Sequence, residues 1–222
     1  MTLAPATVIG VDAATPGLAD ADHLARVVAG ALSLPDGASV GTHAVREGVP
    51  HLALSVTLPD GAAAEGAWRA LTGQAAGPDG PDVPGADVPG AGAHALAADV
   101  LGAGPVGFAF GGLRAGPEAL AAGAAHAAAE RASGAGRAVL FPGADALTGT
   151  VEVAGVVAGS AVDEVVLLGG AGSPGPARRV MTRDHVRPEW RAGRLVLTVM
   201  EAVGGVLVPF EVPDPTPCCA DH

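Results

Sequence analysis

Residues 39–58 read SVGTHAVREGVPHLALSVTL, two runs in which apolar side chains alternate with small or polar ones. Alternation with a period of two is typical of β-strands, because successive side chains point to opposite faces of a sheet. We therefore expect strands at 39–45 and 50–58. In the second strand, one face carries a histidine, an alanine, a serine and a threonine, and the other face carries only leucine and valine.

The turn between these strands carries the sequence Arg46-Glu47-Gly48. A three-residue hairpin loop with Gly48 in the left-handed conformation is a common type, and it places His43 opposite His51. Two imidazoles at that spacing could share a metal ion or a phosphate, or form a solvated pair on a polar face. A loop of two or four residues instead sends the two histidines to opposite faces.

The elements around this hairpin predict a βαββα unit over residues 1–73. Thr7–Asp12 is a short apolar, β-branched run, hence a strand. Asp20 is expected to cap a first helix and Asp60 a second, which ends at Gly73. The order matches the first five elements of a ferredoxin-like split βαβ unit, with its last strand supplied from further along the chain.

The composition changes abruptly at residues 74–92, where Pro, Gly and Asp recur and almost nothing can be buried. This stretch is expected to be a linker or a long surface loop. The remainder, 93–222, begins with Ala-rich segments expected to be helical at Ala93–Leu101 and Pro117–Ser133. Between them, Pro105–Phe110 is a candidate for the missing strand of the first unit.

From Arg137 onward the sequence predicts a small β domain. Gly204-Gly205 is expected to close a hairpin between the last two strands. The fold class is therefore α+β, with a mostly antiparallel C-terminal sheet. The expected strands are Ala138–Phe141, Thr150–Val156, Asp163–Leu168, Leu195–Met200 and Val206–Val212.

Charge and composition limit the possible partners. The net charge is −11, all twelve basic residues are arginine, and no tyrosine is present, so nucleic-acid binding is not expected. The absence of lysine, asparagine and tyrosine suggests a GC-rich genome.

The sequence contains no run of eighteen apolar residues, so no membrane-spanning helix is expected. Met1–Gly10 does not resemble a signal peptide, and two cysteines do not make a disulfide framework, so a cytoplasmic location is expected.

Both cysteines lie in the C-terminal tail, Asp214-Pro-Thr-Pro-Cys-Cys-Ala-Asp-His222. A turn there could bring Cys218, Cys219 and His222 onto one metal ion, and His185 is the preferred fourth ligand because it lies in the same C-terminal part. Sulfur and imidazole ligands suit zinc or another transition metal. The alternatives are a tail with two unpaired thiols and an intersubunit disulfide.

Two further groups of titratable residues are candidates for chemistry. Asp12 at the end of the first strand could hold Mg²⁺ or form an acid–base pair with Asp20, Asp22 and His23, which alternatively only cap and start the helix. His126 and Glu130 are four residues apart on the Ala-rich helix, which suits either two metal ligands or an ordinary exposed pair.

The segment Gly170-Ala-Gly-Ser-Pro-Gly175 fits a G-x-G-x-x-G pattern after an apolar strand. Prolines interrupt the helix that a dinucleotide fingerprint requires, so no dinucleotide cofactor is expected. Backbone amides of this loop, together with Arg178 and Arg179, could still hold an anion.

These observations lead to three functional hypotheses. The first is a cytoplasmic accessory or binding protein with a transition-metal site at the CCxxH tail. The second is an enzyme with its site in a cleft between the two parts. The third is a structural or assembly subunit whose Ala-rich helix and Val-rich strands contact a protein partner or a second copy of the chain.

Overall fold

The computed structural model describes residues 7–73, 104–170 and 172–212 of the chain. The described residues form four α-helices and a mostly antiparallel set of strands, which confirms a fold of mixed helix and sheet. Contacts within the chain divide it into two compact units, unit 1 (Met1–Ser133) and unit 2 (Gly134–His222). None of the described helices is long and apolar enough to cross a membrane.

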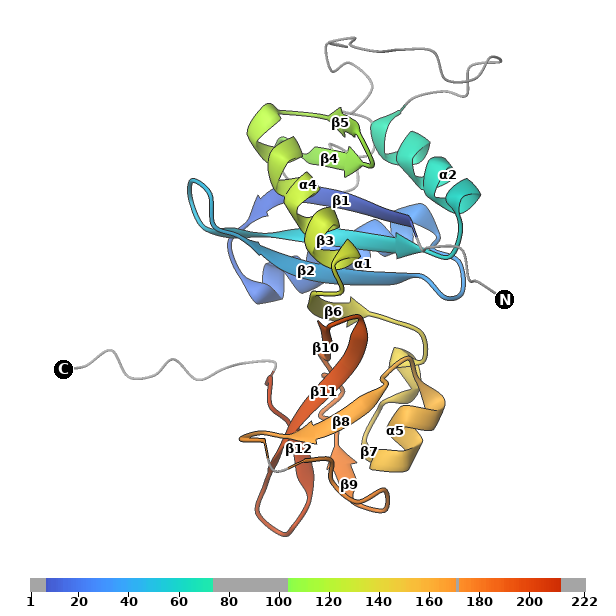
Figure 1. Cartoon of the computed structure of the whole chain (residues 1–222), viewed down its shortest axis with the longest axis vertical. Helices are drawn as coiled ribbons and strands as arrows, with labels where there is room; N and C mark the ends of the chain where they lie inside the picture. The colour runs from blue at the N-terminus through green and yellow to red at the C-terminus, as the bar shows by residue number, and fades with distance from the viewer. Residues whose placement is uncertain (1–6, 74–103, 171, 213–222) are drawn as a thin grey trace, which may run out of the picture. The chain divides into compact units, whose positions relative to one another are not determined.

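Unit 1 contains a five-stranded sheet in the order β5-β4-β1-β3-β2 (Figure 1). Each neighbouring pair is antiparallel. The expected extra strand is confirmed, because β4 pairs with β1, with Phe110 opposite Ile9. The strands are β1 (Thr7–Thr15), β2 (Ser39–Val45), β3 (His51–Leu58), β4 (Gly107–Phe110) and β5 (Leu113–Ala115).

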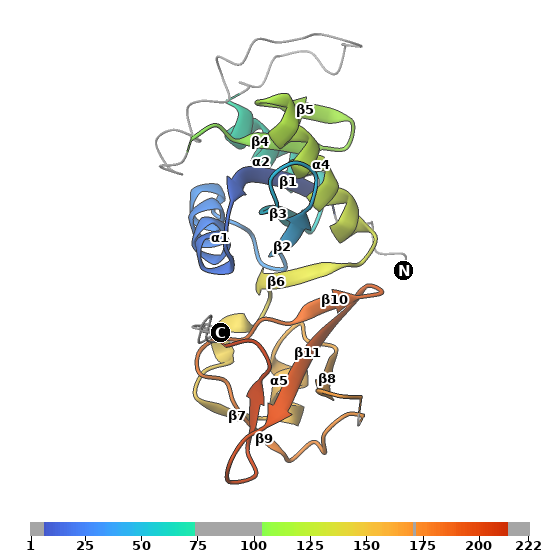
Figure 2. The same ribbon diagram turned by 90° about the vertical axis from the view of Figure 1, so that its left-hand side faces the viewer.

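The two faces of this sheet are covered by different helices (Figure 2). Helices α1 (Leu18–Leu32) and α2 (Gly61–Thr72) pack on the apolar face, where the Trp68 and Phe110 ring centroids are 5.9 Å apart. Helix α4 (Glu118–Ala132) crosses the other face and contacts β1, β2, β3 and β4. This helix therefore belongs to unit 1, whereas the sequence grouped it with the C-terminal strands.

One of the two predicted helix caps is confirmed and the other is wrong. Asp60 caps α2, accepting a hydrogen bond from the Ala63 backbone N–H at 2.8 Å, and Gly73 ends the helix in the left-handed conformation. Helix α1 begins earlier than expected, with Gly17 at the cap position, so Asp20 lies in its first turn. A carboxylate is still favourable there, because the helix N-terminus carries partial positive charge.

Close backbone approach allows α4 to lie on the sheet. A Cβ atom on Gly10 of β1 would lie 1.8 Å from the Ala124 carbonyl oxygen, and one on Gly107 of β4 would lie 2.2 Å from the Leu120 carbonyl carbon. Since real side chains cannot approach so closely, only glycine fits at these two strand positions. The Ala and Gly content of the sequence thus has a packing role, in addition to any effect of genome composition.

Unit 2 contains the strand order β6-β10-β11-β12-β9-β7, and β8 also pairs with β11. The β8–β11 and β12–β9 pairs are parallel, so the sheet is mostly and not wholly antiparallel. The expected β11–β12 hairpin is present, with Gly204 and Gly205 both at positive φ. The strands are β6 (Gly136–Leu140), β7 (Thr150–Glu152), β8 (Glu164–Leu167), β9 (Arg179–Met181), β10 (Glu189–Arg191), β11 (Arg194–Glu201) and β12 (Leu207–Pro209).

The expected strand Thr150–Val156 is wrong in its second half. It ends at Glu152, and Val153–Gly159 forms the short helix α5. Val153 and Val156, three residues apart, are buried, which is the spacing of a helix face and not of a strand. The expected linker 74–92 and helix Ala93–Leu101 lie outside the described residues.

Candidate functional site

A cavity of about 890 Å³ lies within unit 1, between the end of the β2–β3 hairpin and one side of α4. Its wall is largely apolar, with an arginine, two histidines and two glutamates among the apolar side chains. It is formed by Ala14, Ala44, Val45, Arg46, Glu47, Gly48, Val49, His51, Ala119, Leu120, Ala122, Gly123, His126 and Glu130. Cavities of this size, apolar with a few polar groups, are typical of small-molecule sites.

The hairpin turn at the cavity differs from the predicted one in length. Gly48 has φ of 73°, as expected, but Val45 pairs with His51, so five residues form the loop in place of three. His43 therefore pairs with Ala53 and does not face His51 directly. Both histidines still lie on the same face of the sheet, because paired residues in antiparallel strands share a face.

His51, in the cavity wall, forms a partly buried ion pair with Asp12. His51 Nε2 lies 2.9 Å from Asp12 Oδ2, and His51 Nδ1 lies 2.7 Å from the Val49 carbonyl oxygen. Burial lowers the pKa of His51, but the hydrogen bonds to Val49 and Asp12 and the Asp12 charge outweigh burial and raise it above 6.5. When the ring is protonated, both N–H groups donate to oxygen, so neither nitrogen is free for proton transfer.

Asp12 is fully buried and has both carboxylate oxygens occupied, because Oδ1 accepts the Ala14 backbone N–H at 2.8 Å. Its side chain points toward α4, where a Cβ on Gly123 would lie 1.9 Å from Oδ2. Helix α1 covers the opposite face, so the expected grouping of Asp12 with Asp20, Asp22 and His23 is wrong. Asp12 pairs with a histidine 39 residues away instead.

A second polar chain runs under α4 to the cavity. His43 Nε2 lies 2.8 Å from Ser55 Oγ, and His43 Nδ1 lies 3.1 Å from Glu130 Oε2. Burial lowers the pKa of His43 to about 4, although the hydrogen bond and charge of Glu130 act in the other direction. The order serine, histidine, carboxylate is that of a hydrolase triad. Ser55 is fully buried, however, so no substrate can reach its hydroxyl group.

Glu130 also approaches His126, the partner that the i,i+4 spacing predicted. His126 Nε2 lies 3.6 Å from Glu130 Oε1, and both side chains are partly exposed at the cavity wall. The structure therefore brings three separate sequence candidates to one place: the two hairpin histidines, Asp12 and the His126–Glu130 pair. Ser55 and Gly123 were not among the residues predicted for a site, although the alternating pattern places Ser55 on the histidine face.

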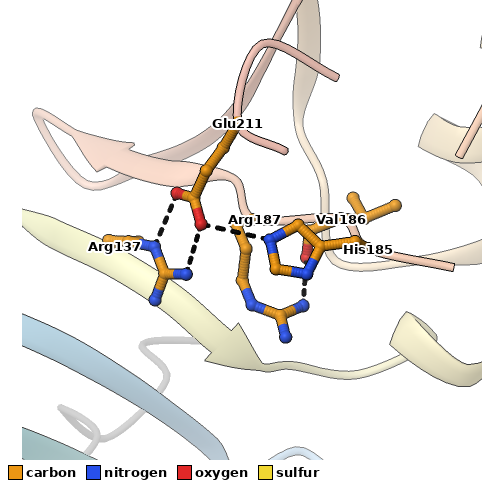
Figure 3. A network of polar contacts seen from close by, with 5 residues as sticks. All are labelled: Arg137, His185, Val186, Arg187 and Glu211. Atoms are coloured by element: carbon orange, nitrogen blue, oxygen red, sulfur yellow. Dashed lines mark hydrogen bonds and ion pairs between the residues drawn. The ribbon is translucent and has the colours of Figure 1, made fainter. Parts of the chain in front are cut away.

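The predicted metal ligands are only partly within the described residues. Cys218, Cys219 and His222 lie outside them, and His185 lies inside. His185 Nε2 is 3.2 Å from Glu211 Oε1, and Glu211 also makes a two-point ion pair with Arg137 (Figure 3). These contacts lower the pKa of Glu211 despite its burial. Among the described residues, no group of three or more histidine, cysteine or acidic side chains is arranged to hold a metal ion.

The loop at 170–175 offers little support for anion binding. Arg178, one of the two arginines expected to assist, donates hydrogen bonds to Glu201 at 3.3 Å and to the Gly205 carbonyl oxygen at 3.2 Å. Arg179 begins strand β9 and pairs with Glu152 of β7 in the sheet. Thus Arg178 is already engaged with protein groups.

Comparisons with protein families, with curated proteins and with solved structures gave no match for this chain. The cavity and its polar groups are therefore the features of the chain that bear on its function.

Proposed function

We propose that the chain is a binding protein whose ligand site is the unit 1 cavity between the β2–β3 hairpin and α4. The observation that carries this proposal is the combination of a cavity of about 890 Å³ with two buried polar chains that end at its wall. Buried polar groups cost free energy unless they are fully hydrogen-bonded. Asp12, His51, His43 and Ser55 meet that condition and hold the wall in a fixed geometry.

A pocket-blocking substitution tests this function directly. Ala122 is exposed, lies on α4 and forms part of the wall, so Ala122→Trp fills the cavity without disturbing the core. Ala70→Trp is the control, because Ala70 is an exposed alanine of helix α2 that lies outside this wall. Ligand-observed NMR with a fragment library should give hits that disappear in Ala122→Trp and persist in Ala70→Trp. Identical hits in all three proteins would show that this cavity is not the ligand site.

The metal-binding tail is a second candidate function, supported by the position of His185. This residue contacts Glu211, which lies immediately before the last described residue, Val212. Six residues lie between Glu211 and Cys218, and an extended chain covers roughly 3.5 Å per residue, so a cysteine thiolate has enough chain to return to His185. Because Glu211 occupies Nε2, the available donor of His185 is Nδ1.

Metal content and thiol titration test the tail. Purified protein is expected to carry zinc or another transition metal, and the double variant Cys218→Ser/Cys219→Ser should lose it. Equal metal content in both proteins, with two freely reacting thiols in the wild type, would refute metal binding by the tail.

We further propose that unit 1 is a ferredoxin-like fold with an added β5 and α4. The antiparallel order β4-β1-β3-β2, with α1 and α2 on one face, supports this assignment. The enzyme and assembly-subunit hypotheses stay predictions. For an enzyme, the described wall offers His126 and Glu130 as proton-transfer groups. For an assembly subunit, a stable oligomer without bound ligand is the expected observation.

A further inference from the structure

Glu130 is a carboxylate of the cavity wall that is held in place by a buried side chain. The His43 side chain that contacts it has 0% exposed surface, while Glu130 itself is 40% exposed. His43 is held in turn by Ser55, which is fully buried on strand β3. A buried serine and a buried histidine thus fix the direction of a single partly exposed carboxylate.

The direction of each hydrogen bond follows from the protonation state of His43. At pH 7 the ring is neutral and has one N–H group, because burial lowers its pKa to about 4. A carboxylate oxygen accepts hydrogen bonds, so the N–H is on Nδ1 and donates to Glu130 Oε2, and the Ser55 hydroxyl group donates to Nε2. Glu130 Oε1 lies 3.6 Å from His126 Nε2, beyond hydrogen-bond distance. Oε1 is therefore the oxygen available to a ligand.

We infer that the cavity binds an amphipathic amine, with its ammonium group on Glu130 Oε1 and its apolar body against the alanine, valine and leucine side chains of the wall. This inference rests on the proposed function of the cavity. A charge-assisted hydrogen bond from an ammonium group to an oriented carboxylate is among the stronger polar contacts in proteins. The net charge of −11 also favours the approach of a cation over that of an anion.

Two basic side chains in the wall, His51 and Arg46, do not reverse this preference. His51 is neutralised by Asp12 at 2.9 Å, and both of its ring nitrogens are engaged. Arg46 is exposed on the hairpin loop, next to Glu47, which also lines the cavity. An organic anion held by Arg46 is the competing ligand class, and it makes the opposite prediction for substitutions at Arg46 and Glu130.

Three probes of equal chain length separate the ligand classes: hexylamine, hexanoate and 1-hexanol, titrated by calorimetry at pH 7.5. We expect hexylamine to bind at least about tenfold more tightly than the other two, because a charge-assisted hydrogen bond corresponds to that factor or more. Glu130→Gln should remove this advantage while keeping an acceptor for His43. Glu65→Gln is the matched control, since it removes the same charge from an exposed position on α2.

Two results would overturn the inference that the ligand is an amine, while the cavity would remain a binding site. One is tighter binding of hexanoate that is lost in Arg46→Ala, and the other is equal binding of all three probes. An amine preference that survives in Glu130→Gln would overturn the role of Glu130. Binding of no probe to the wild type would overturn the amine inference, and the Ala122→Trp comparison would then decide separately whether the cavity binds other ligands.

Discussion

His43 should make unit 1 sensitive to mild acid. In the unfolded chain the ring takes up a proton near its ordinary pKa of 6.5, whereas burial lowers the pKa in the folded protein to about 4. Between these values the unfolded state binds more protons than the folded state, so the free energy of unfolding falls as the pH falls. The slope approaches about 1.4 kcal/mol per pH unit.

Integrated from pH 7 to pH 5, this difference corresponds to a loss of about 2 kcal/mol in the free energy of unfolding. The comparison stops at pH 5 to stay above the ordinary glutamate pKa of 4.5. The pKa of Glu211 is lowered in the folded protein, so Glu211 stabilises unit 2 above pH 4.5 and loses this contribution at lower pH. His51 has the opposite sign: its pKa is raised, so its contribution is complete below pH 6.5 and is lost as the pH rises. That contribution is common to wild type and variant and cancels in their difference.

The assay is urea unfolding at both pH values for the wild type and His43→Gln. Glutamine keeps one donor for Glu130 and one acceptor for Ser55 but does not titrate. The two tryptophans, Trp68 and Trp190, lie one in each unit, so Trp68 fluorescence in a Trp190→Phe background reports unit 1. The variant should lose about 2 kcal/mol less than the wild type over this range. An equal loss in both proteins would refute the buried, neutral state of His43.

Three further predictions concern other contacts of the structure. Asp12→Asn should lower the pKa of His51, since the carboxylate raises it, and an NMR titration of the imidazole would refute this if the pKa were unchanged. Gly123→Ala should lower the free energy of unfolding by about 1–3 kcal/mol, because its Cβ would meet a buried carboxylate. Gly66→Ala, with open space around it, should raise the free energy of unfolding by roughly 0.5–1 kcal/mol. Equal effects of the two substitutions in thermal unfolding would contradict the packing argument. Glu211→Gln should destabilise unit 2 by on the order of 1–3 kcal/mol and remove its acid sensitivity below pH 4.5, as followed by circular dichroism.

The local pattern of the sequence was sufficient to predict most of unit 1. The predictions of strands at 39–45 and 50–58, of the cap at Asp60 and of Pro105–Phe110 as the added strand depend on short-range periodicity or on a sheet edge that needs a partner. In unit 2 the same rules worked less well. The run from Thr150 to Val156 is rich in valine, which is compatible with a strand or with a buried helix. In the structure Val153 begins a helix, and Val153 and Val156 form its buried face.

Register was the property that local chemistry predicted least well. Gly48 adopts the left-handed conformation that the turn signal requires, but the loop includes Val49 and Pro50 as well. Pro50 cannot donate a ladder hydrogen bond, so the second strand begins one residue later, at His51. The slip is two residues, and an even slip keeps His43 and His51 on one face.

The candidate site shows why faces can be predicted when partners cannot. Alternation placed His43, His51 and Ser55 on one side of the hairpin, and this depends only on neighbouring residues. Their partners lie far along the chain: Asp12 is 39 residues from His51, and Glu130 is 87 residues from His43. Which helix covers that face depends on the path of the chain between β3 and α4, and no periodicity encodes that path. The histidine face was unusually polar for a surface that packs against a helix, and a search for distant carboxylates able to satisfy it is the step by which sequence reasoning could have found the site.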